Sequence, residues 1–164
     1  MKVVKVFLWM LVLIWAGVIF YMSNQTATQS SDLSGSVIWD MCERFYKGFL
    51  QMSSEEKADL VEYLQDIVRT VAHICEYGLL GILIRSAFIP YKLNHKILIS
   101  SLISLNYSIS DEIHQFFVPG RAYQFSDILC DTFGAVLGIL VVSLICGICK
   151  KIRIKNSKKG LQFN

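Results

Sequence analysis

The sequence predicts an all-α membrane protein: a polytopic bundle of four transmembrane helices plus one short amphipathic helix outside the cytoplasm. Apolar residues make up 54% of the 164 residues and the mean hydropathy is +0.47, which is more apolar than soluble domains usually are. Four runs are long enough to cross a bilayer. Only two prolines occur and no alternating ten-residue segments are found, which favours helices over an outer-membrane barrel.

The first predicted span covers residues 6–22. This run is apolar, contains Trp9 and Trp15, and follows Lys2 and Lys5. Its length is about what a tilted helix needs to cross the membrane. A cleavable signal peptide would carry the same flanking charge, but no Ala-x-Ala site follows the run, so we expect an uncleaved anchor.

The segment after this span is predicted to be a loop followed by a short helix. Residues 23–36 are rich in Ser, Thr, Asn and Gln, a composition typical of loops. Residues 37–50 place apolar side chains at helical spacing with charged residues between them, which predicts an amphipathic helix. This helix lies either on the membrane surface or as a cap on the other helices, and the sequence leaves both open.

The second span lies within a long helix that starts in water. Ser53 and Glu56 form a Ser-x-x-Glu capping box, and apolar residues continue from there at helical spacing. Residues 68–87 are its transmembrane part, which ends before Pro90 and a basic turn. Polar residues at steps of four, and then three or four, share one side of this span: Arg69, His73 and one of Glu76 or Tyr77.

The third span must include polar residues. Its apolar part, residues 97–109, is about 20 Å long, which is short of a hydrocarbon core of about 30 Å. The helix is therefore expected to continue to residue 118, just before Pro119 and Gly120, and to carry acids into the membrane. We predict a polar stripe along it at steps of four and three: Ser100, Ser104, Tyr107, Asp111 and His114.

The fourth span is predicted over residues 126–150, after a Pro-Gly-Arg turn that ends at Arg121. Ser126 can cap this helix, and Asp127 falls in its first turn, where the helix dipole favours an anion. Asp131 lies one turn deeper.

Small residues on the fourth span predict close helix packing. Gly134 and Gly138 form a Gly-xxx-Gly motif, which lets another helix approach within the chain or in an oligomer. Cys146 and Cys149 lie on the same span. The five cysteines are scattered, so they predict neither a disulfide framework nor a metal cluster.

The charges predict the orientation in the membrane. Eleven of the sixteen Lys and Arg residues flank the two ends and the loop between spans two and three, whereas eight of the thirteen acids lie in the long first loop. The positive-inside rule therefore places both termini in the cytoplasm and the polar cluster outside. We divide the chain into a transmembrane domain, residues 1–150, and a basic cytoplasmic tail, residues 151–164. Such a tail contacts anionic lipid, and no nucleic-acid partner is expected.

Three of the predicted spans and one turn deliver polar groups to the outer half of the membrane. Carboxylates beside histidines can exchange protons, which gives five catalytic candidates: His73, Glu76, Asp111, Glu112 and His114. Five further residues are candidates for binding a polar or anionic group: Arg69, Gln115, Arg121, Asp127 and Asp131. The alternative is that the arginines neutralise the acids and the cluster only stabilises the bundle.

A metal site stays open at this point. His73 with Glu76, and Glu112 with His114, offer nitrogen and oxygen ligands. Neither pair has the four-residue spacing of the helical His-x-x-x-His zinc motif, so we assign no metal ligand and predict no cofactor.

Three motifs carry a family resemblance: Asp-Glu-Ile-His-Gln-Phe-Phe-Val-Pro-Gly-Arg at 111–121, Asp127-xxx-Asp131-xx-Gly134-xxx-Gly138, and Arg69-xxx-His73-xx-Glu76-Tyr77. Together they resemble the VanZ-like family of bacterial membrane proteins, and the resemblance covers nearly the whole chain. It implies a small multi-pass protein of the bacterial plasma membrane, related to a protein that gives low-level teicoplanin resistance. The resemblance supplies no catalytic assignment.

Three functions are compatible with this pattern. The site binds an anionic lipid or a lipid-linked cell-wall precursor and so affects glycopeptide susceptibility, it hydrolyses a lipid-linked phosphate, or it carries such a lipid across the membrane with protons. Whether the protein is an enzyme stays open. The expected partners are membrane lipids, a lipid-linked precursor or a glycopeptide, with an oligomer possible through Gly134 and Gly138.

Overall fold

The computed structural model describes residues 2–160, which form helices and no strand. The bounds are α1 Lys2–Ser23, α2 Ala27–Phe45, the 3-10 helix η1 Phe49–Gln51, α3 Ser54–Ala87, α4 Lys96–Phe116 and α5 Phe125–Gly160. The prediction of an all-α protein is confirmed. Residues 161–164 of the predicted basic tail lie outside the described residues.

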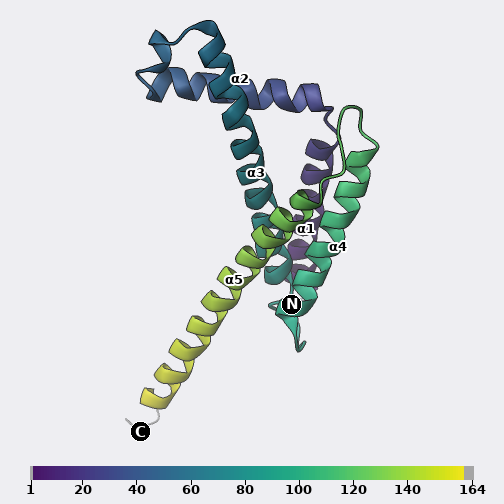
Figure 1. Ribbon diagram of the computed structural model, residues 1–164. Coiled ribbons are helices and arrows are strands. Elements are labelled where there is room, and N and C mark those ends of the chain that lie inside the picture. Colours follow the sequence, from purple (N-terminus) through teal and green to yellow (C-terminus); the bar gives the residue numbers. More distant parts are fainter. Residues whose placement is uncertain (1, 161–164) are drawn as a thin grey trace.

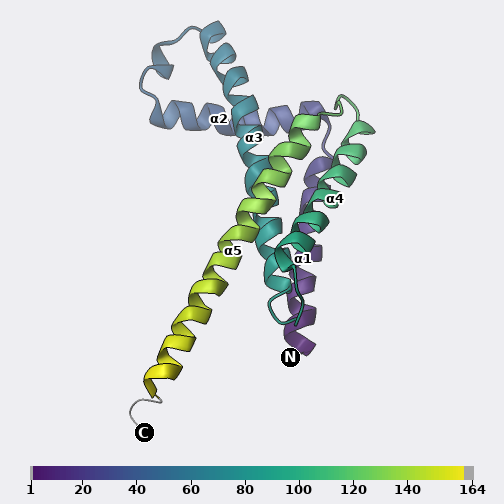
Figure 2. The same cartoon turned by 60° about the horizontal axis from the view of Figure 1, so that its bottom comes forward.

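Four helices run side by side and the remaining helix crosses one end of them. In Figure 1, α1, α3, α4 and α5 form the bundle, while α2 lies across it. We call the end with α2 and the α4–α5 loop the upper end. The lower end holds the N-terminus and the α3–α4 loop, and the second half of α5 projects from it in both views (Figures 1 and 2).

Three helices of the described chain are long and apolar enough to cross a membrane: α1, α3 and α5. Many of their apolar side chains are exposed, among them Leu13 and Leu144, as expected of helices that face lipid. The fourth predicted span, α4, is 21 residues long but does not reach this apolarity. Its polar residues are the reason, and six of them are buried against the other helices: Ser100, Ser104, Ser108, Asp111, Glu112 and Gln115.

The prediction of a loop over residues 23–36 is wrong, because α2 already begins at Ala27. Thr26 and Gln29 form a capping box at its start: the Gln29 N–H donates to Thr26 Oγ1 at 3.3 Å, and the Thr26 N–H donates to Gln29 Oε1 at 3.1 Å. The polar run that follows is helical and packs on α3, where Gln65 Nε2 donates to the carbonyl of Ser31. The helix ends at Phe45 rather than at 50.

The starts of the two long helices agree better with the sequence. The Ser53–Glu56 capping box is confirmed, with the Ser53 N–H donating to Glu56 Oε2 at 2.8 Å, and α3 then runs unbroken for 34 residues. Helix α5 begins one residue before Ser126. It continues past residue 150 into the basic tail, which contains good helix formers and no glycine or proline until Gly160.

The Gly-xxx-Gly motif of α5 packs against α3 of the same chain. A Cβ atom at Gly134 would collide with the carbonyl of Ile74, and one at Gly138 with the carbonyl of Gly78. The two backbones therefore touch where α5 has no side chain. This surface is occupied within the chain and is not free for a second copy.

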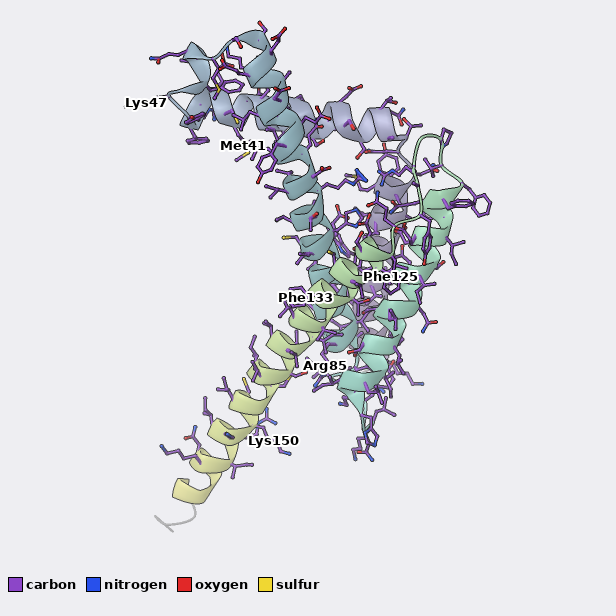
Figure 3. The ribbon with its side chains drawn as sticks, in the orientation of Figure 1. Met41, Lys47, Arg85, Phe125, Phe133 and Lys150 are labelled. Atoms are coloured by element: carbon purple, nitrogen blue, oxygen red, sulfur yellow. The ribbon has the colours of Figure 1, made fainter. Side chains whose placement is uncertain are left out.

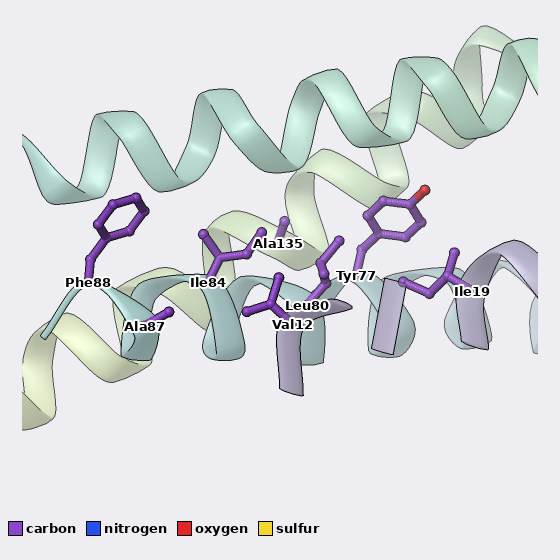
Figure 4. Close-up of a cluster of buried hydrophobic side chains, with 8 residues drawn as sticks. All are labelled: Val12, Ile19, Tyr77, Leu80, Ile84, Ala87, Phe88 and Ala135. Carbon is purple, nitrogen blue, oxygen red and sulfur yellow. The ribbon is translucent and has the colours of Figure 1, made fainter. Parts of the chain in front are cut away.

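An apolar cluster fills the bundle below the buried polar side chains that the next section describes. Figure 4 shows its eight side chains, which come from α1, α3, the residue after α3, and α5: Val12, Ile19, Tyr77, Leu80, Ile84, Ala87, Phe88 and Ala135. Tyr77 is fully buried, and its hydroxyl donates a hydrogen bond to the buried Asp111 of α4.

Candidate functional site

His73, Asp131 and Ser108 join three helices in the upper half of the bundle. His73 Nδ1 on α3 lies 3.0 Å from Asp131 Oδ1 on α5, and Ser108 Oγ on α4 donates to Asp131 Oδ2 at 2.8 Å. The Asp131 and Ser108 side chains are almost completely buried. No other basic side chain pairs with a carboxylate among the described residues, and the hydrogen bond to Asp131 fixes the orientation of the His73 imidazole.

Asp111 is a second buried acceptor, and it connects α4 to α1 and α3. Its Oδ2 accepts from Ser23 Oγ at 2.8 Å, from Tyr77 Oη at 3.2 Å and from Gln115 Nε2 at 3.2 Å. Its Oδ1 is buried and makes no hydrogen bond within residues 2–160. Three donors on one carboxylate oxygen hold the upper end of α1 against α3 and α4.

Gln115 links this carboxylate to an arginine. Its Nε2 donates to Asp111, while its Oε1 accepts from Arg121 Nη1 at 2.8 Å. Arg121 Nε also donates to the carbonyl of Gln25. The arginine is thus positioned by neutral acceptors and forms no ion pair with a carboxylate in the described chain.

Glu112 is also buried, but on a different side of α4. Its Oε1 accepts the backbone N–H of Gln124, which immediately precedes α5. The side chain therefore fastens the α4–α5 loop to α4. This contact gives Glu112 a structural role, and it does not line the cavities described next.

A cavity of about 270 Å³ opens at the upper end, between the end of α1, α2, α3 and the α4–α5 loop. We call it the upper cavity. Its wall combines apolar residues of α2 and α3 with five of the predicted site residues: Arg69, His73, Glu76, Gln115 and Arg121. Figure 3 shows side chains with nitrogen and oxygen atoms gathered in this region, below α2.

A second cavity, of about 360 Å³, lies on the other side of Arg69 and His73. We call it the side cavity. It is lined by polar groups of α3 and of the start of α5, including Asp66 and Asp127. Asp127 is half-buried in the first turn of α5, where it accepts from Ser126. Arg69 and His73 thus separate two cavities, one partly apolar and one polar.

His114 does not join the other candidates. Its ring stacks on Phe20 of α1, with centroids 4.5 Å apart, and its Nε2 is buried without a hydrogen-bond partner in the described chain. Neither cavity includes it.

Glu76 does line the upper cavity. Its carboxylate makes no hydrogen bond among residues 2–160, while its backbone carbonyl accepts a hydrogen bond from Trp15.

The buried polar stripe of α4 differs in phase from the predicted one. The buried stripe contains Ser108 and Gln115, whereas the prediction had Tyr107 and His114 at these places. The inward face follows steps of four, four, three and four from Ser100. The sequence pattern did not indicate Ser23 and Gln25 as site residues, because they fall in the segment predicted to be a loop. Their position directly after an apolar run was the available signal.

The donors present do not assemble a metal centre. Among residues 2–160, no group of three or more His, Cys, Asp or Glu side chains has an arrangement that could hold a metal ion. All five cysteines are free thiols. The groups of the upper cavity that remain available to a ligand are the two arginines, the histidine and the Glu76 carboxylate.

The family model described as VanZ/LLP1 matches residues 7–146. The chain belongs to the VanZ/LLP1 family. No curated protein and no solved structure gives a significant match to the chain. The part that matches the VanZ/LLP1 model extends from α1 into the second half of α5, so it includes every candidate residue and both cavities.

Proposed function

We propose that this VanZ/LLP1 membrane protein lies in the bacterial plasma membrane with both termini in the cytoplasm and α4 as a fourth crossing. The chain enters and leaves the bundle at the lower end (Figure 1), and the basic residues concentrate there. The buried polar residues of α4 face the other helices, as a polar helix in lipid requires. The upper cavity then faces outward.

At the upper cavity we propose binding of the phosphate of a membrane lipid or of a lipid-linked cell-wall precursor. The observation that carries this proposal is that Arg69 and Arg121 line the same cavity without being paired to a carboxylate. Guanidinium groups match phosphate oxygens and form strong charge-assisted hydrogen bonds. Leu33, Val37 and Val68 supply an apolar wall for the hydrocarbon that follows the phosphate.

The buried acids support this assignment because they accept hydrogen bonds from groups other than Arg69 and Arg121. Asp111 accepts from three donors, Asp131 accepts from His73 and Ser108, and Glu112 accepts from the backbone of residue 124. Of the carboxylates, only Glu76 lines the upper cavity beside the two arginines. The wall therefore carries an excess of positive charge.

Binding to a polyprenyl phosphate tests the proposal. The full-length protein in nanodiscs is titrated with this lipid, and Arg69→Gln is compared with Arg44→Gln, which makes the same charge change on an exposed residue of α2 outside the cavity. Loss of one charge-assisted contact should weaken binding at least fivefold in R69Q and less than twofold in R44Q. Equal affinities would contradict the proposal.

We further propose that occupancy of this site contributes to teicoplanin resistance. The motifs at 111–121 and around Arg69 that carry the family resemblance contribute five residues to the wall of the upper cavity: Arg69, His73, Glu76, Gln115 and Arg121. Expression in a susceptible bacterium should raise the inhibitory concentration of teicoplanin. R69Q should lose this effect at unchanged membrane abundance, and retention of the effect would argue against the site.

Hydrolysis of the bound phosphate ester is the second candidate function, and the Asp131–His73 pair favours it. Asp131 holds Nδ1, which leaves Nε2 of His73 on the cavity wall to accept a proton from water. The resulting hydroxide would attack phosphorus, the bond to the lipid oxygen would break, and the imidazolium would return the proton to the leaving alcohol. Purified protein should then release inorganic phosphate, and His73→Gln should abolish release while R44Q retains it. Lipid binding without phosphate release would restrict the function to binding.

A further inference from the structure

Arg85 is the one arginine buried in the lower half of the described bundle. It lies in the last turn of α3 and is 9% exposed, and Figure 3 labels it where the helices lie close together. Its Nε donates to Ser143 Oγ of α5 at 2.9 Å. Its Nη1 is buried and makes no hydrogen bond within residues 2–160. A buried guanidinium is costly unless its donors meet acceptors, and an anion is the strongest acceptor.

The start of α4 lies beside Arg85, and both line one cavity. The N-cap residue, His95, has φ = 58° and makes no side-chain capping hydrogen bond. The first N–H groups of this 21-residue helix therefore lack a side-chain acceptor, and the positive end of the helix dipole lies there. Such helix starts bind phosphate and other anions.

A cavity of about 670 Å³ brings these two features together. We call it the lower cavity, and its wall includes Arg85, the His95–Lys96 start of α4, and Ser101 one turn further along. Lys96 donates to the carbonyl of Ile89 at 3.4 Å, which leaves two of its three ammonium donors for a ligand. Two cationic side chains and a helix start thus converge on one space.

The surroundings contain no competing carboxylate. The sequence has no acid between Tyr77 and Ser110 and none after Asp131. The lower cavity is lined on its outer side by Ile97 and Leu98, which are 45% and 58% exposed. Apolar side chains form the larger part of the wall and the polar groups named above form the smaller part, so the lower cavity fits a phosphate that carries a hydrocarbon chain.

We propose that the lower cavity is a second anion site, in which Arg85, Lys96 and the start of α4 bind a phosphate group. This site is separate from the upper cavity, which lies at the opposite end of the bundle. The phosphate comes either from an anionic membrane lipid or from solution, and the apolar part of the wall favours the lipid.

Arginine side-chain NMR tests the site directly, because the chain has only five arginines: Arg44, Arg69, Arg85, Arg121 and Arg153. Full-length protein labelled with 15N-arginine is titrated with short-chain phosphatidic acid in one arm and with inorganic phosphate in the other. The Arg85 resonance, assigned by its loss in Arg85→Lys, reports the lower cavity. Arg69 and Arg121 report the upper cavity, so the two sites are distinguished in one spectrum.

The Arg85 resonance should shift with a saturable dependence on phosphatidic acid. A shift with inorganic phosphate alone would assign the site to free phosphate, and a shift with the lipid alone would assign it to lipid; either supports a phosphate site. The proposal is overturned if Arg85 does not shift in either arm, or if the exposed Arg44 shifts equally.

Lys96→Gln tests the contribution of the second cation to phosphate binding. Lys96 lies at the edge of the bundle, so its loss leaves the buried contacts intact. K96Q should weaken binding at Arg85 at least fivefold. Lys150→Gln makes the same charge change on the projecting half of α5, away from Arg85 (Figure 3), and should change binding less than twofold. Equal effects of the two variants would reduce the site to non-specific attraction and overturn the proposal.

Discussion

His73 of α3 and Asp131 of α5 form a hydrogen-bonded pair, with Nδ1 and Oδ1 3.0 Å apart. Asp131 is buried, whereas His73 reaches two cavities. The pair therefore connects the packing of the bundle to the surface that a ligand would touch. Its contributions to stability and to function can be separated by variants.

Loss of the Asp131 carboxylate should destabilise the protein. Asp131→Ala leaves His73 and Ser108 without their acceptor, and we expect the free energy of unfolding in detergent to fall by about 1–3 kcal/mol. Asp127→Ala removes an acid of the same helix whose side chain accepts only from Ser126, and should cost less than about 1 kcal/mol. Thermal unfolding checks the difference, and equal effects would show that the Asp131 contacts are not stabilising.

The contact between α3 and α5 should not tolerate a methyl group. Gly138→Ala places a Cβ against the backbone of α3, and we expect a loss of about 1–3 kcal/mol in unfolding free energy. Gly147→Ala is the matched control, because nothing lies within 4 Å of its Cβ position and alanine favours a helix. G147A should be neutral or slightly stabilising. A neutral G138A would contradict the close approach.

The proposal that α4 crosses the membrane predicts opposite accessibilities for its two flanking loops. In a cysteine-free background, Asn94→Cys should react with an impermeant thiol reagent only from the cytoplasmic side, and Ala122→Cys only from the outside. The two positions flank α4 in the chain. Labelling of both cysteines from the same side would show that α4 does not cross.

The capping box at the start of α3 predicts a local pH dependence. The hydrogen bond from the Ser53 N–H holds the pKa of the exposed Glu56 carboxyl below its ordinary value of 4.5. The cap therefore stabilises α3 at pH values above 4.5, and this contribution is lost as pH falls through the lowered pKa. A carbon-13 NMR titration of Glu56 measures it, and a midpoint at or above 4.5 would contradict the cap.

Much of the architecture could be predicted because apolar runs and helix caps are local signals. The spans around Trp15 and Gly134 and the Ser53 cap needed only periodicity and spacing. The start of α2 could not be predicted from composition, since Ser and Thr residues are common in loops and its helix is stabilised by contacts with α3. Thr26 and Gln29 were a capping signal that the loop prediction overlooked.

The candidate site was predicted in part, and the limit was helix phase. Spacing placed His73, Asp111 and Asp131 on three neighbouring helices, and the structure brings His73 and Asp131 into contact. Residue spacing alone could not decide which of the adjacent residues His114 and Gln115 faces inward, because both lie three or four residues after Asp111. Their rotation is set by packing against α1, where His114 meets Phe20.

A structure with a bound polyprenyl phosphate locates the phosphorus atom and so tests directly whether the upper cavity binds phosphate. Phosphate oxygens are expected within about 2.7–2.9 Å of guanidinium nitrogens of Arg69 or Arg121, with the hydrocarbon leaving along α2 past Val37. Phosphate density outside the upper cavity, with both arginine side chains unmoved, would contradict binding at this site.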